Sequence, residues 1–186
     1  AYSNLGNILR DLGKLEEAEI SQRKAIKINP NFAMAYSNLG NILRDLGKLE
    51  EAEVSQRKAI KIDKKFANAY SNLGNILRDL GRSKEAELST RKAIKLDPNF
   101  AVAYSNLGVI LRDHGNLKEA EKYARKAIEI APNNLLAYSS LGSILNDQGK
   151  SEEALDLYLK VMKINPKNPN IYNLSTFLLK DSDLSK

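Results

Sequence analysis

The tripeptide Ala-Tyr-Ser recurs along the chain every 34 residues, and this period constrains the fold more than any other feature of the sequence. It begins at Ala1, Ala35, Ala69, Ala103 and Ala137. Self-similarity of this length indicates stacked structural units, each of which buries its apolar side against its neighbours. We therefore expect five units, at 1–34, 35–68, 69–102, 103–136 and 137–168, and the start of a sixth at 169–186 that acts as a C-terminal capping helix. The first two units differ at only five positions.

The spacing of apolar residues predicts two helices in every unit. On a helical wheel of the first twelve residues, at about 100° per residue, one arc collects Tyr2, Leu5, Ile8, Leu9 and Leu12. The opposite side collects Ser3, Asn4, Asn7, Arg10 and Asp11. After Gly13, the expected left-handed cap, a second helix is predicted from Leu15 to Ile28, with Ala18, Ala25, Ile26 and Ile28 facing inward. Asn29-Pro30 ends it, and a proline there suits the start of the next helix.

A glycine lies in the middle of the first helix of every unit, as at Gly6 and Gly40. Glycine costs about 1 kcal/mol relative to alanine in a helix interior. Its recurrence indicates that the second helix packs too closely for a Cβ. The small side chains of Ala18 and Ala25 are the expected contact surface.

The net charge of +6 follows a regular order along each unit. In the second helix the acids come early, as at Glu16 and Glu17, and the bases come late, as at Lys24 and Lys27. This order complements the helix dipole, which stabilises each well-placed charge by roughly 0.3–1 kcal/mol. These charges are therefore explained by a solvent-exposed face of the second helix, without a charged partner. We expect no nucleic-acid partner, because that would require a continuous basic stripe.

The apolar runs are too short to span a bilayer, so we expect no membrane partner. The chain holds no cysteine, which excludes disulfides and thiolate metal sites. The first residues have neither the basic stretch nor the apolar core of a signal peptide. They also lack an initiator Met and already lie inside a repeat. We expect a piece of a longer, cytoplasmic protein.

The residues that could support catalysis are all explained by the repeat. Its ten glycines fall two to a unit, which leaves none for a phosphate-binding loop. The single histidine, His114, lies where other units have leucine and makes neither a metal site nor a triad. Recurring aspartates such as Asp11 share one environment, whereas paired catalytic acids need two. We expect the aspartates to pair with arginines of neighbouring units, and we expect no enzyme activity, metal or cofactor.

Asparagines and arginines recur on the polar side of the first helix. An asparagine amide both donates to and accepts from a peptide backbone, so rows of asparagines at a fixed spacing could hold an extended polypeptide without reading its side chains. The candidate binding residues are Asn4, Asn7, Arg10, Asn38, Asn41, Arg44, Asn72, Asn75, Arg78, Asn106 and Arg112. The alternative interpretation is that the asparagines satisfy backbone groups between units.

The spacing of Leu5-Gly6, Ala18, Ala25 and Pro30 resembles the signature of the tetratricopeptide repeat (TPR) family over almost the whole chain. The resemblance implies an all-α, right-handed superhelical solenoid of helix-turn-helix repeats, in which the first helices line a concave groove. The asparagine row is similar to the one that lines the TPR superhelix of O-linked N-acetylglucosamine transferase, which implies recognition of a peptide backbone. The chain departs from the family in its second helices, where Gln22, Gln56, Thr90 and Ala124 replace an aromatic residue and only Tyr158 conforms.

The favoured function is a protein–protein interaction scaffold that binds an extended polypeptide in the groove. Two alternatives stay open. One is an engineered or recently duplicated repeat array with no cognate ligand. The other is the substrate-recognition arm of a larger transferase.

The outward side of the second helices carries an apolar row of Ile20, Val54 and Leu88. Exposed apolar rows tend to mark contact surfaces, so we expect this one to mediate self-association. Gln22 would then point toward the packed side. The alternative is a slightly rotated helix that buries Ile20 and exposes Gln22.

Overall fold

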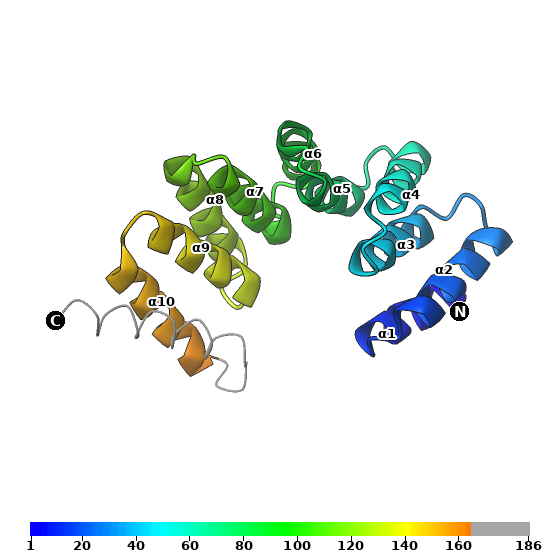
Figure 1. Ribbon diagram of the computed structural model, residues 1–186, viewed down its shortest axis with the longest axis horizontal. Helices are drawn as coiled ribbons and strands as arrows, with labels where there is room; N and C mark the ends of the chain where they lie inside the picture. The colour runs from blue at the N-terminus through cyan, green and yellow to red at the C-terminus, as the bar shows by residue number, and fades with distance from the viewer. Residues whose placement is uncertain (165–186) are drawn as a thin grey trace. The chain divides into compact units, whose positions relative to one another are not determined.

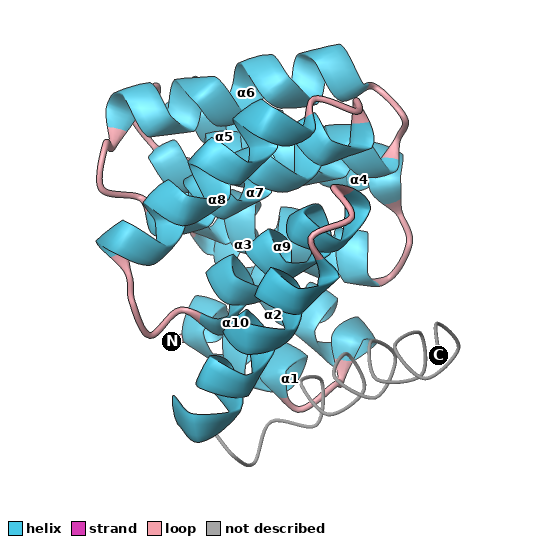
Figure 2. Ribbon diagram, turned by 90° about the vertical axis from the view of Figure 1, so that its left-hand side faces the viewer, coloured by secondary structure: helices cyan, strands magenta, loops and turns pink. Residues whose placement is uncertain are grey.

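The computed structural model describes residues 1–164, and every regular element within them is an α-helix (Figure 1). The helices are α1 (Tyr2–Asp11), α2 (Leu15–Ile28), α3 (Ala33–Asp45), α4 (Leu49–Ile62), α5 (Ala67–Asp79), α6 (Ser83–Leu96), α7 (Ala101–Asp113), α8 (Leu117–Ile130), α9 (Leu135–Asp147) and α10 (Ser151–Ile164). Figure 2 shows short loops between them and no strand among the described residues. The expected all-α repeat fold is confirmed. The capping helix expected at 169–186 lies outside the described residues.

The chain divides into two compact units, Ala1–Pro98 and Asn99–Lys186. The first contains α1 to α6, and the described part of the second contains α7 to α10. Within each unit a helix packs against the helix that follows it. First helices of neighbouring pairs also pack on one another, α1 on α3 and α3 on α5 in the first unit, and α7 on α9 in the second.

A glycine with positive φ ends every first helix, as the sequence predicted. Gly13 has φ +75°, and its equivalents in later pairs lie between +73° and +76°. The Gly13 N–H donates to the Arg10 carbonyl at 2.9 Å, and the Lys14 N–H donates to the Leu9 carbonyl at 2.8 Å. These two bonds form a Schellman motif, which satisfies the last carbonyls of the helix. The following helix can therefore start within two residues.

The turn after each second helix differs from its prediction. Pro30 does not open the next helix, because α3 begins at Ala33. Asn29 instead accepts the Asn31 N–H on its side-chain oxygen at 3.1 Å, and Asp63 accepts the Lys65 N–H in the same way at 2.8 Å. An asparagine or aspartate at this position forms the turn by itself, so the proline can be lost in the second repeat.

Burial of the first helices depends on their place in the chain. Leu39, Ile42 and Leu43 of α3 are buried. The equivalent Ile8 of α1 is 56% exposed while Ile42 is fully buried, because α3 packs on both α1 and α5, whereas α1 packs on α3 alone among the first helices. Much of the apolar arc of α1 is therefore exposed. In the second helices Ala18 and Ala25 are buried as expected, but Ile28 is exposed.

The mid-helix glycines allow a close approach of the paired helix, as expected, although the contact differs. A Cβ built on Gly6 would stand 2.7 Å from Nε2 of Gln22, and Gly40 faces Gln56 at the same distance. At Gly108 the nearest atom is the carbonyl oxygen of Ala120, at 3.2 Å. The second-helix position that Gln22 and Gln56 occupy is thus the one that packs on the glycine in the first two pairs.

Candidate functional site

The first-helix face is the surface formed by the polar sides of α1, α3 and α5 in the first unit. The helical wheel placed the serines on this polar side, away from the apolar arc, yet they are not exposed. Ser3, Ser37 and Ser71 are buried. Asn38 donates from Nδ2 to Oγ of Ser3, and Asn72 donates to Ser37, both at 3.2 Å. The serine of one repeat is therefore covered by the asparagine of the next.

A second asparagine row is held by the buried glutamines. Nε2 of Gln22 donates to the Ser3 carbonyl at 2.8 Å and to Oδ1 of Asn7 at 3.0 Å. Gln56 makes the same pair of bonds one repeat later, to the Ser37 carbonyl and to Asn41. Each glutamine fixes the orientation of its asparagine's side-chain amide, because only the oxygen Oδ1, and not Nδ2, can accept the hydrogen bond from the glutamine Nε2. The Nδ2 of the asparagine then faces away from the glutamine.

The arginines and aspartates of the face form the ladder that the sequence predicted. Arg10 donates from Nε to Oδ2 of Asp45, and Arg44 donates to Asp79, both at 2.6 Å. In the second unit, Nε of Arg112 lies 3.6 Å from Oδ2 of Asp147. These arginines neutralise the carboxylates of the following repeat. The face consequently presents amides between paired charges instead of an excess of either sign.

The asparagines do contact the neighbouring repeat, but through a serine hydroxyl and not through the backbone groups that the alternative interpretation expected. Asn38 and Asn72 satisfy a neighbouring serine, yet both remain half-buried, as do Asn7, Asn41 and Asn75. Within residues 1–164, one donor hydrogen of Asn38 is used and its Oδ1 has no partner. Asn4 is exposed, whereas Asn106 in the second unit is buried. Of the candidate asparagines, Asn38, Asn41 and Asn72 of α3 and α5 combine a fixed orientation with groups that remain partly open to solvent.

The outer face is the opposite surface of the first unit, formed by the solvent sides of α2, α4 and α6. The row predicted there is exposed: Ile20 by 55%, Val54 by 68% and Leu88 by 70%. Gln22 and Gln56 are fully buried. The alternative of a rotated second helix is therefore wrong.

Sequence reasoning missed a set of clamps between second helices and the following pair. Glu19 accepts from Nζ of Lys48 at 2.8 Å and from Arg23 at 2.8 Å. Glu121 is held in the same way by Lys150 and Arg125. Burial alone would raise the pKa of Glu121, but these hydrogen bonds lower it to about 2. The sequence did contain a signal for these ion pairs, because a lysine or arginine recurs 29 residues after each such glutamate.

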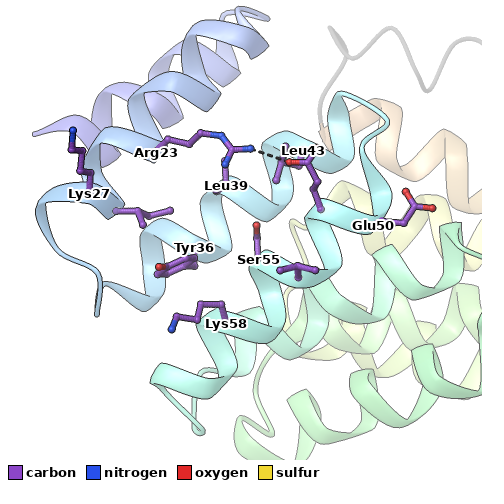
Figure 3. A pocket seen from close by; sticks show the side chains of 11 residues that line it. Arg23, Lys27, Tyr36, Leu39, Leu43, Glu50, Ser55 and Lys58 are labelled. Carbon is purple, nitrogen blue, oxygen red and sulfur yellow. Dashed lines mark hydrogen bonds and ion pairs between the residues drawn. The ribbon is translucent and has the colours of Figure 1, made fainter.

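Sequence reasoning also missed two pockets on the outer face, one between α2 and α4 and one between α4 and α6 (Figure 3 shows the first).

The described residues contain no group of three or more histidine, cysteine, aspartate or glutamate side chains arranged to hold a metal ion. Within residues 1–164, each helix falls short of the length and apolar character that a bilayer-spanning segment needs.

Comparison with known families gives a consistent result along the chain. Models for the tetratricopeptide repeat match residues 67–100 and 99–167, and a model for the TPR repeat matches residues 6–43 and 40–81. No curated protein sequence matches the chain significantly.

Several solved structures are similar to this chain. The thermophilic TPR protein TTC0263 of Thermus thermophilus is 21% identical with a TM-score of 0.89, covering 96% of this chain and 97% of its own. MamA is 28% identical with a TM-score of 0.67, covering 87% and 95%. YrrB, a TPR protein with an unusual peptide-binding site, is 25% identical with a TM-score of 0.63, covering 94% and 90%.

Proposed function

Because the chain belongs to the tetratricopeptide repeat family, whose members serve as protein–protein interaction scaffolds, we propose that it binds an extended polypeptide along its first-helix face. The observation that carries this proposal is the half-buried asparagine row of α3 and α5. Asn38 and Asn72 are oriented by their bonds to Ser3 and Ser37. Their remaining donor and acceptor groups match the alternating N–H and C=O groups of an extended backbone.

Pre-oriented amides lose little conformational freedom on binding, which favours affinity. The hydrogen bonds from Gln22 and Gln56 likewise fix the orientation of the side-chain amides of Asn7 and Asn41. The Arg–Asp ladder removes net charge from the face, so recognition there depends on backbone hydrogen bonds. YrrB, a structural relative with a peptide-binding site, offers a parallel for peptide binding by this fold.

The ligand is polypeptide without a strong charge preference, and its sequence can be found by selection. A phage-displayed library of random linear peptides is selected on the full chain, and the enriched peptides are tested on variants by fluorescence anisotropy. Asn38→Ala and Asn72→Ala should each weaken binding by about 1 kcal/mol, since each removes one hydrogen-bonding partner. Asn31→Ala, in an exposed turn, is the matched control and should change affinity little.

The side-chain amide resonances of Asn38, Asn41, Asn72 and Asn75 should shift when the peptide is added. If enriched peptides bind the double variant Asn38→Ala/Asn72→Ala as tightly as the wild type, this face is not the site. If the library yields no binder at all, the array has no general affinity for extended polypeptide and the proposal fails.

A further inference from the structure

The second helices of the first unit stand apart on the outer face. The Cα atoms of α2 and α4 stay more than 8 Å from one another, whereas α1 and α3 pack directly. The gap leaves a pocket of about 670 Å³ with α3 as its floor (Figure 3). Its apolar wall is formed by Ile26, Tyr36, Leu39, Leu43 and Val54. A pocket of this volume accepts an aromatic or large aliphatic side chain with room for its neighbours.

The pocket recurs one repeat later between α4 and α6. The second pocket has a volume of about 490 Å³. Its apolar residues are Ile60, Tyr70, Leu73, Leu77 and Leu88, each 34 residues beyond its counterpart. Small serines, Ser55 and Ser89, line corresponding places in the two walls. The two pockets are therefore a consequence of the repeat, and they offer two similar apolar sites side by side.

The charges around the pockets are unequal. Arg23 is compensated by Glu51, at 3.0 Å, across the first pocket. Lys27 and Lys58 have no carboxylate partner within residues 1–164, and Nζ of Lys58 lies 5.9 Å from the centre of the Tyr36 ring. Figure 3 shows both lysines near Tyr36 at one end of the pocket and Glu50 at the other.

The second pocket has the same imbalance. Arg57 is compensated by Glu53 and by Glu85. Lys61 and Lys64 line this pocket as well, and neither is paired with a carboxylate in the described part of the chain. Glu50 also lacks an ion-pair partner among the described residues, but at the first pocket the two lysines outnumber it. The balance of uncompensated charge is thus positive at both pockets and lies beside apolar walls.

We propose that the outer face binds an acidic polypeptide segment that inserts apolar side chains into the two pockets and places carboxylates against the lysines. Apolar walls supply affinity through buried area. Uncompensated lysines supply orientation and select the partner by charge. A second copy of the chain would bring the same positive excess to the contact, so the charges favour a partner of opposite sign over self-association. This site is separate from the first-helix face.

The test uses the same phage-displayed library on the full chain, with enriched peptides sorted by the variant that abolishes their binding. Lys27→Glu/Lys58→Glu reverses the charge at the first pocket. Lys118→Glu/Lys160→Glu changes the net charge equally at exposed positions of the second unit that line neither pocket. Val54→Glu/Leu88→Glu places carboxylates at both pocket mouths. All six positions are exposed, and circular dichroism checks that each variant stays folded.

The expected result is a class of peptides with net negative charge and apolar anchors. Their affinity should fall about tenfold or more for Lys27→Glu/Lys58→Glu and for Val54→Glu/Leu88→Glu. It should stay within about twofold for the control pair and for Asn38→Ala/Asn72→Ala. Backbone amide shifts on peptide binding should centre on Tyr36, Val54 and Lys58.

Three outcomes would overturn the proposal. One is an absence of acidic peptides among the binders. Another is acidic peptides that bind the lysine variant and its control equally, which would show only general attraction to a basic protein. The third is sedimentation of the chain as a dimer that Val54→Glu/Leu88→Glu converts to a monomer, which would assign the row Ile20, Val54 and Leu88 to self-association. Failure here leaves the first-helix binders unaffected, because they respond to the asparagine variants alone.

Discussion

Gln22 and Gln56 each occupy the place under a mid-helix glycine that Tyr158 fills under Gly142. Nε2 of Gln22 makes two hydrogen bonds, but Oε1 is buried without a partner in the described part of the chain. An unpartnered buried oxygen costs roughly 1–3 kcal/mol. The benefit is specificity: the amide ties the carbonyl of Ser3 and the side chain of Asn7 into one fixed arrangement. A ring without a polar group would fill the volume without orienting either group.

The contact between Gly40 and Gln56 gives a prediction at this scale. Gly40→Ala should destabilise the chain, because overpacking costs about 1–3 kcal/mol and helix propensity returns about 1 kcal/mol. In a Gln56→Ala background the same substitution should cost less, because at Gly108, which lies above Ala124, the nearest atom is the Ala120 carbonyl oxygen at 3.2 Å and no longer a side-chain amide at 2.7 Å. Urea denaturation of the four chains in this cycle measures the coupling. A coupling below about 0.5 kcal/mol, the usual limit of additivity, would mean that the helices move apart easily and that the close approach carries no constraint.

At the scale of helices, the clamps between pairs make stability depend on pH. The pKa of Glu121 lies at about 2 in the folded chain and near 4.5 for an unperturbed glutamate. A lowered folded-state pKa contributes stability that is complete above about pH 4.5 and is lost as the pH falls toward 2. The contribution is about 3 kcal/mol at most.

Glu121→Gln should therefore flatten the loss of stability between pH 5 and pH 3, measured as the free energy of unfolding in urea at each pH. Glu152→Gln is the matched control, because that side chain of α10 is exposed and has no ion-pair partner among the described residues. Equal pH profiles for wild type and Glu121→Gln would assign the acid sensitivity to other carboxylates.

The helices also show how far the sequence alone predicts this fold. The bounds of α2, Leu15–Ile28, match their prediction, because a glycine cap and an Asn/Asp turn are local signals. The Arg10–Asp45 pair was predicted as well, since stacking repeats must bring such residues together. The burial of Ser3 and the outer pockets were not predicted. Both depend on the distance between neighbouring helices, which a wheel of one helix does not contain.

At the scale of the whole molecule, stability should be a sum of units and of the contacts between them. Deleting residues 35–68 joins Met34 to Ala69 and keeps every repeat in register. The shortened chain should stay helical, with a lower melting temperature and a smaller urea dependence of its unfolding free energy, because less surface is buried. Circular dichroism during heating and urea titration measures both. Lys118→Glu, a surface change expected to stay within about 0.5 kcal/mol, is the comparison. A deleted chain that is unfolded would show that the repeats do not act as independent units.

The hydrogen bond from Asn38 to Ser3 and the ion pair of Arg10 with Asp45 affect how easily the number of repeats in the gene can change. Each of the first four repeats carries the serine, asparagine, arginine and aspartate of both contacts, and Asn72 bonds Ser37 and Arg44 pairs with Asp79 in the same way. Unequal crossing-over can insert or remove one 34-residue repeat in the gene. Each new contact between repeats then again brings an asparagine to a serine and an arginine to an aspartate. Such a gene can change its copy number in one step without a compensating mutation. Near-identical neighbours such as residues 1–34 and 35–68 are the kind of sequence that this tolerance allows to accumulate.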